Sequence, residues 1–236
     1  DPSLLALVAC GTFLVYAVDR RTTFSPEDLA HREQIPPLPA AALAAPFAVL
    51  LVLTLRRHAA GMLTILGLGV LSALYILPLL PDRRRLKEIP FVKVLAVAAG
   101  WAVATTVLPA VQCGATPSLE VGVLAAYRTL FLLPNLLLAD WPDRASDRNA
   151  GILTVANYLR PGRFLLVCRS ACLATMAAMS MLWLFGLLPG RTAWELDTPF
   201  AFLIILSRPL PSSRLFYAVF ADALLAWPAI PAMFPE

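Results

Sequence analysis

The chain has 236 residues, of which 59% are hydrophobic and only 14% are charged, and its mean hydropathy is +0.75. Soluble domains carry about 25% charged residues, so this composition excludes an ordinary soluble domain and indicates an integral membrane protein. The formal net charge is +4, but no nucleotide or nucleic-acid motif accompanies it. We therefore expect a single all-α transmembrane helix bundle over residues 1–236, with no nucleic acid among its partners.

Hydrophobic stretches close to the roughly 20 residues that cross a bilayer recur along the whole chain. They predict eight spans, at residues 3–18, 38–55, 60–80, 91–111, 118–139, 163–188, 198–207 and 214–233. The seventh stretch is too short to cross a bilayer alone, and Pro199 and Pro209 mark its two ends. The four cysteines form no CxxC motif, which predicts packing rather than metal binding or redox chemistry.

The distribution of basic residues predicts the orientation in the membrane. The loops after the odd-numbered spans contain most of the lysines and arginines, including the run from Arg83 to Lys87. The loops after the even-numbered spans contain only Arg56, Arg57 and Arg191. The positive-inside rule therefore makes the odd loops cytoplasmic, in a bacterial inner membrane. Within the first of them, Ser25 and Pro26 predict the start of a short surface helix over 26–33.

Three aspartates follow the long apolar run of the fifth predicted span. Asp140, Asp143 and Asp147 are three and four residues apart, so they share one face if the helix continues through them. Clustered carboxylates repel one another and are stabilised by cations, and Mg²⁺ prefers oxygen ligands together with phosphate. The spacing therefore predicts a magnesium site at the cytoplasmic end of a helix, with Arg144 beside it.

Ionisable residues inside the spans leave two interpretations open. Arg128 lies roughly 18 Å along a helix before Asp140, and Asp222 lies midway through the last span. Charged groups in lipid normally face the bundle interior. Either Arg128 pairs with Asp222, or it contacts a substrate or pigment in a polar cavity. The other residues predicted to line that cavity are Asn135, Tyr16, Tyr75 and Tyr127.

This order of parts resembles the UbiA-type superfamily of intramembrane prenyltransferases. Those proteins are helical bundles, usually of nine spans, with two aspartate motifs on cytoplasmic helix ends. The family's second motif, Asp-x-x-Asp-x-x-x-Asp with Gly and Thr after it, is matched by Asp140, Asp143, Asp147, Gly151 and Thr154. The stretch from Tyr75 to Trp101 also resembles the connection between the family's middle spans. The resemblance covers residues 10–160, and it implies a further helix before the first span seen here.

The family's first motif is incomplete in this chain. It reads Asn-Asp-x-x-Asp-x-x-x-Asp, and only its middle aspartate is present, as Asp19. Tyr16 and Thr23 replace the other two, while Arg20 and Arg21 add positive charge. The resemblance assigns catalysis and Mg²⁺ binding to Asp19, Asp140, Asp143 and Asp147. Substrate binding is expected of Arg20, Arg84, Arg85, Lys87, Arg128, Asn135 and Arg144.

Two functions follow from these patterns. The first is a divergent, Mg²⁺-dependent prenyltransferase that moves a polyprenyl group from its diphosphate to an aromatic or tetrapyrrole acceptor, with Mg²⁺ neutralising the leaving diphosphate. The second is a non-catalytic subunit of a larger membrane complex that keeps the fold and binds lipid, quinone, pigment or partner subunits. The complete second motif favours the enzyme, and the incomplete first motif favours the binding subunit. Membrane lipids are expected partners of either one.

Overall fold

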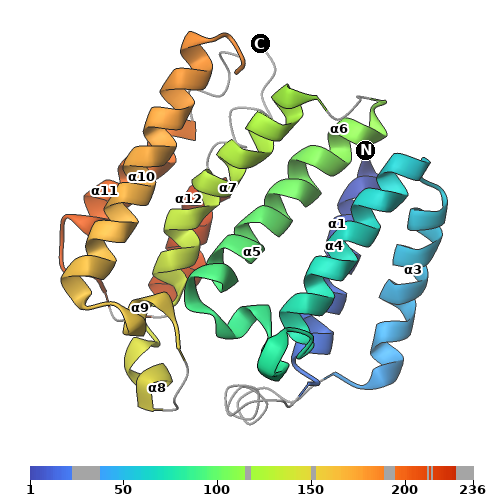
Figure 1. Cartoon of the computed structure of the whole chain (residues 1–236), viewed down its shortest axis with the longest axis horizontal. Helices are drawn as coiled ribbons and strands as arrows, with labels where there is room; N and C mark the ends of the chain where they lie inside the picture. Colours follow the sequence, from blue (N-terminus) through green and yellow to red (C-terminus); the bar gives the residue numbers. More distant parts are fainter. Residues whose placement is uncertain are drawn as a thin grey trace.

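The computed structural model describes residues 1–22, 38–114, 118–149, 153–188, 195–211, 213 and 215–226. Within these ranges the regular elements are helices and no strand occurs, which confirms the expected all-α fold. Figure 1 shows the long helices lying side by side and running alternately up and down. The short surface helix expected over 26–33 falls outside the described residues.

Five helices are long and apolar enough to cross a membrane. They are α1 (Pro2–Asp19), α4 (Ala59–Ile76), the continuous stretch Pro90–Gln112, α7 (Leu119–Ala139) and α10 (Pro161–Leu184). At 1.5 Å per residue, helices of 18 to 24 residues extend roughly 27–36 Å, which matches a hydrocarbon core about 30 Å thick. Five of the predicted spans are therefore confirmed as helices of membrane-crossing length.

The other three predicted spans are shorter in the structure. The second consists of η1 (Ala40–Leu43) and α3 (Ala44–Leu55), and the seventh is α11 (Asp197–Leu206). The eighth is described only as η6 (Phe216–Ala221) and α12 (Asp222–Ala226). The count of eight crossings is therefore not established by the described residues.

Local sequence signals explain where the helices begin and where one changes its winding. The Asp1 carboxylate accepts a hydrogen bond from the Ser3 N–H at the start of α1, and Ser118 caps α7 in the same way. The third long helix consists of α5 (Pro90–Ala102), a π-helical turn η4 (Val103–Val107) and α6 (Leu108–Gln112). The π turn lies just before Pro109, which has no N–H for the preceding turn and disrupts the regular ladder there.

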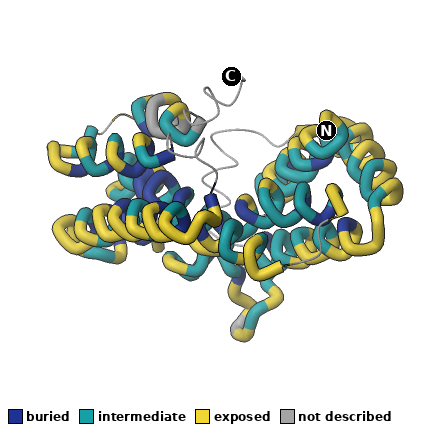
Figure 2. Tube along the Cα trace, turned by 90° about the horizontal axis from the view of Figure 1, so that it is seen from above, coloured by how far each residue is buried: buried dark blue, intermediate teal, exposed yellow. Residues whose placement is uncertain are grey.

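The core lies where α5, α7, α10 and α11 pack against one another. Its centre contains Phe164 and Cys168 from α10 together with Leu138 from α7 and Phe202 from α11, all almost fully buried. By contrast, α3 has no buried residue, and Figure 2 shows the helices near the N-terminus as mainly half-buried or exposed. Apolar side chains exposed along α3 and α4 suit helices that face lipid.

Candidate functional site: a charged helix end and an apolar groove

One end of the bundle gathers most of the positive charge. The ends of α1, α4 and α7 and the beginnings of α5 and α10 all lie toward the lower side of the bundle in Figure 1. We call this the basic end. Its described basic residues are Arg20, Arg21, Arg83, Arg84, Arg85, Lys87, Lys93, Arg144, Arg148, Arg160 and Arg163. The opposite end carries Arg56 and Arg57 in the turn between α3 and α4.

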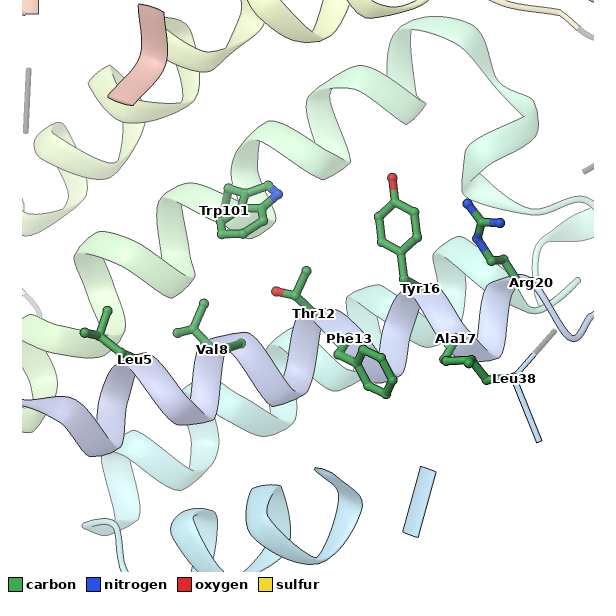
Figure 3. Close-up of a pocket in the computed structure, with 10 residues that line it drawn as sticks. Leu5, Val8, Thr12, Phe13, Tyr16, Ala17, Arg20, Leu38 and Trp101 are labelled. Atoms are coloured by element: carbon green, nitrogen blue, oxygen red, sulfur yellow. The ribbon is translucent and has the colours of Figure 1, made fainter. Parts of the chain in front are cut away.

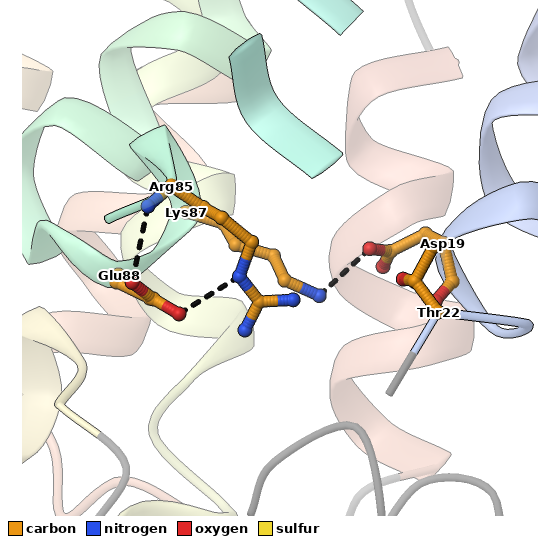
Figure 4. Close-up of polar contacts among 5 residues, drawn as sticks. All are labelled: Asp19, Thr22, Arg85, Lys87 and Glu88. Carbon is orange, nitrogen blue, oxygen red and sulfur yellow. Dashed lines mark hydrogen bonds and ion pairs between the residues drawn. The ribbon is translucent and has the colours of Figure 1, made fainter. Parts of the chain in front are cut away.

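Two buried cations and two carboxylates lie where α1 meets the turn before α5 (Figure 4). The Lys87 Nζ donates to Asp19 Oδ1 at 2.7 Å, and only 5% of Lys87 is exposed. The Arg85 side chain is completely buried, and its Nε donates to Glu88 Oε1 at 2.8 Å. The Arg85 backbone N–H donates to the other Glu88 oxygen at 3.0 Å. The predicted substrate contacts Arg85 and Lys87 are thus counter-ions inside the protein.

The turn that carries these residues has an unusual backbone. It includes η2 (Pro81–Arg83) and η3 (Leu86–Glu88), and Arg83 adopts a left-handed φ of 56°. This conformation costs a non-glycine residue about 1–2 kcal/mol. The chain folds back tightly here, since the Leu80 N–H donates to the Arg84 carbonyl at 3.1 Å. Arg84 is exposed, unlike Arg85 and Lys87, which are buried.

The three aspartates of the second motif do not lie on one helix, so that prediction is wrong. The helix α7 ends at Ala139, and Asp140 is its C-cap. Pro142 follows, and a proline disfavours helical geometry in the residue before it, so the chain turns there. A new short helix, α8 (Arg144–Asn149), begins after Asp143 and contains Asp147. The Asp140 carboxylate accepts from Lys93 Nζ of α5 at 3.4 Å.

Aromatic and capping contacts hold the segment that follows the aspartates. The Arg144 guanidinium carbon lies 4.0 Å from the centre of the Trp141 ring, and Trp141 stacks on Phe164 with ring centres 5.0 Å apart. Thr154 and Asn157 form a capping box at α9 (Val155–Tyr158), and Thr154 is 1% exposed. In the described contacts, Thr154 therefore acts as a helix cap.

This arrangement does not fit the predicted magnesium site. Among the described side chains, no three His, Cys, Asp or Glu residues lie close enough together to hold a metal ion. Mg²⁺ requires a near-octahedral shell of oxygens, whereas Asp19 and Asp140 are each paired with a lysine ammonium. For these two carboxylates the protein itself supplies the positive charge.

A groove runs along α1 and reaches the basic end (Figure 3). Leu5, Val8, Thr12 and Tyr16 line it from α1 at helical spacing, and Trp101 of α5 lines the opposite wall. Its volume is about 650 Å³, within the range of ligand pockets. Its other lining residues are Ala9, Phe13, Ala17, Arg20 and Leu38. The walls are therefore mainly apolar, with one guanidinium at the end nearest Lys87 and Asp19.

A second polar cluster lies away from the basic end. The Arg128 Nη2 is 2.7 Å from Glu195 Oε1, and the Tyr127 hydroxyl donates to Glu195 Oε2 at 2.7 Å. Glu195 and Tyr127 are buried, whereas 37% of the Arg128 side chain is exposed. The carboxylate partner of Arg128 is thus Glu195, and the side chain of Asp222 lies outside the described part of the structure. Tyr127 belongs to this cluster and not to the groove lining.

The two arginines that occur inside predicted spans hold the two ends of α11. The Tyr127 hydroxyl also contacts the Met179 sulfur at 3.4 Å, which places Glu195 at the level of Met179 on α10. At the other end, Arg169 Nη2 donates to the Leu206 carbonyl at 2.6 Å. Met179 and Arg169 lie roughly 27 and 12 Å from the start of α10, and α11 is roughly 15 Å long. Both ends of this short helix therefore lie within the bundle.

The predicted substrate residues consequently fall in different regions. Arg20, Arg84, Arg85 and Lys87 are at the basic end, and Arg144 is beside the aspartates there. Arg128 is in the second polar cluster, and Asn135 is 6% exposed in α7 between the two regions. Three residues that the sequence did not single out have clear contacts, namely Lys93, Trp101 and Glu195. For Glu195 the available signal was Arg128, since a cation in a span requires a carboxylate.

Comparison with known proteins adds no relative: no family model, curated protein or solved structure matches this chain. The resemblance to the UbiA-type superfamily therefore rests on the sequence alone, namely on the aspartate motif and the stretch from Tyr75 to Trp101. The features of the described structure that bear on function are the groove and the charges at its end.

Proposed function

We propose that this protein is a non-catalytic UbiA-type membrane subunit that binds an isoprenoid amphiphile with an anionic head group. The observation that carries the proposal is the apolar groove along α1, which ends at Arg20. From Leu5 to Arg20 the groove-lining face extends roughly 22 Å along the helix. An apolar chain that lies in this groove contacts the groove walls in place of lipid, and its head group then lies at the basic end.

Charge complementarity supports an anionic head group. Arg20 makes no ion pair among the described residues, and its guanidinium lies 6.0 Å from the Tyr16 ring centre. A guanidinium can donate two parallel hydrogen bonds to phosphate or carboxylate oxygens. By the positive-inside rule, we place this end on the cytoplasmic side of a bacterial inner membrane. In this proposal membrane lipids surround the bundle, and partner subunits or pigments are other molecules that the protein binds.

Prenyl transfer is the second candidate, because the aspartate motif pattern favours it. Asp19 and Asp140 also lie at the same end of the bundle, one in each half of the chain. In this candidate a polyprenyl diphosphate is the donor, and Asp140, Asp143, Asp147 and Asp19 bind Mg²⁺. The paired lysines and the divided aspartates make it the weaker candidate.

The test is binding of geranylgeranyl phosphate to purified protein in detergent micelles, followed through tryptophan fluorescence. Thr12→Trp fills the groove, and Leu63→Trp puts the same bulk on the exposed face of α4 as a matched control. We expect Thr12→Trp to weaken binding by about tenfold or more and Leu63→Trp to leave it unchanged, because only the first removes groove volume. Equal binding by Thr12→Trp and the wild type would contradict the proposal.

A second binding experiment, with geranylgeranyl diphosphate, distinguishes the two candidate functions. Binding of geranylgeranyl diphosphate that requires Mg²⁺ and is lost in Asp143→Ala would favour the transferase. Binding that is the same in Mg²⁺ and in EDTA, with Asp143→Ala equal to the wild type, would favour the non-catalytic subunit.

A further inference from the structure

Asp19 and Asp140, one from each aspartate motif, are each paired with a lysine. Both lysines come from the short stretch 87–93. Lys87 reaches Asp19 at the end of α1 with a separation of 2.7 Å. Lys93, in the first turns of α5, reaches Asp140 at the end of α7 with a separation of 3.4 Å. A single segment thus places one ammonium group against a carboxylate in each half of the bundle.

The burial of these groups makes the pairing structural rather than incidental. The Lys87 side chain is 6% exposed and its Asp19 partner 30%, while Lys93 and Asp140 are 21% and 18% exposed. A buried ammonium group is costly unless a carboxylate compensates it, and the reverse is also true. Arg85, which is 0% exposed, places a further positive charge beside Lys87.

These charges oppose a divalent cation in two ways. A metal ion has to displace an ammonium group that is covalently tethered beside the carboxylate, where its effective concentration is high. It also has to approach within a few ångströms of Lys87, Arg85 or Lys93, and like charges repel strongly at partly buried sites. An acidic group that has its own tethered cation therefore gains little from a metal.

We infer that Lys87 and Lys93 occupy the places of divalent cations, so that the basic end receives an anionic head group without metal. The part that concerns the head group rests on the proposed function, whereas the part that concerns the aspartates does not. The ligand class is an amphiphile whose phosphate or carboxylate is neutralised by Arg20 and by the field of the tethered lysines. Mg²⁺ is not a component of this site.

The first experiment measures Mn²⁺ binding to the purified protein in micelles by electron paramagnetic resonance, with no amphiphile present. The wild type is expected to bind no more Mn²⁺ than Asp19→Asn/Asp140→Asn. Lys87→Gln/Lys93→Gln keeps the carboxylates and removes both ammonium groups, so it is expected to bind Mn²⁺ about tenfold or more tightly than the wild type. Lys87→Arg/Lys93→Arg keeps the charge and is expected to behave as the wild type.

Two outcomes would overturn the inference: Mn²⁺ binding by the wild type that Asp19→Asn/Asp140→Asn abolishes, or no gain of Mn²⁺ affinity in the glutamine variant. If that variant does not fold, Lys93→Gln alone replaces it, because the Lys93 side chain is 21% exposed and that of Lys87 only 6%. Its Mn²⁺ affinity must then rise and must fall again with Asp140→Asn. Because the assay contains no amphiphile, its result is independent of whether the groove binds an isoprenoid chain.

Discussion

The ion pair between Arg128 and Glu195 allows a quantitative prediction. Glu195→Gln preserves the shape of the side chain and an oxygen that accepts from the Tyr127 hydroxyl, but it removes the charge opposite Arg128. Two unit charges about 4 Å apart attract by about 4 kcal/mol at an effective dielectric constant near 20. Removing one partner of a fully buried pair destabilises a protein by about 3–5 kcal/mol.

The exposure of Arg128 makes the expected loss of stability smaller than for a fully buried pair. Glu195 is 7% exposed, but Arg128 is 37% exposed, so its guanidinium regains part of its solvation when the carboxylate is neutralised. The rings of Tyr127 and Phe131, each centred 5.9 Å from the guanidinium carbon, continue to stabilise the cation. We therefore expect Glu195→Gln to lower the free energy of unfolding by about 2–3 kcal/mol.

The assay is equilibrium unfolding by SDS in mixed micelles, read by tryptophan fluorescence. The matched control is Asp197→Asn, an exposed carboxylate on the first turn of α11, which is expected to cost less than about 1 kcal/mol. Arg128→Met completes a double-mutant cycle, and its coupling with Glu195→Gln should be about 1 kcal/mol or more. Additive effects in the cycle, or a Glu195→Gln loss as small as that of the control, would refute the reasoning.

Three further variants test other contacts by the same titration. Arg169→Met removes the donor to the Leu206 carbonyl at the end of α11. It should lower the free energy of unfolding by about 1.5–3 kcal/mol and speed hydrogen exchange near Leu206. Unchanged exchange there would show that this hydrogen bond is unimportant. In Gly61→Ala, the new methyl group meets the Gln112 side-chain amide, whose buried nitrogen has no partner among the described atoms. The substitution should destabilise the wild type, but it should stabilise the Gln112→Ala variant by about 1 kcal/mol. A change of stability with the same sign in both backgrounds would contradict this. Thr175→Val removes hydroxyl donation to the Leu130 and Ala171 carbonyls and should cost about 0.6–1.7 kcal/mol, so a gain in stability would argue against these bonds.

Sequence reasoning was most successful where a property is local. The long apolar runs correspond to α1, α4, α7 and α10 with ends displaced by a few residues, because burial in lipid depends on a continuous stretch of chain. The shortness of the seventh stretch was also visible, and α11 is the resulting half-length helix. The aspartate spacing was misread because Pro142 interrupts the helix that the spacing argument assumed.

What the sequence by itself determined is the class of the molecule: an all-α bundle with helices long and apolar enough to cross a membrane, and with its positive charge concentrated at one end. Only the tertiary structure decided which charges meet. Glu195 reaches Arg128 across 67 positions, and Lys87 reaches Asp19 across 68. The physical reason is that composition and periodicity are properties of continuous stretches of chain, whereas an ion pair depends on how helices pack. Helix packing brings the lysines to the aspartates, and this contact is what turns an expected metal site into a proposed metal-free one.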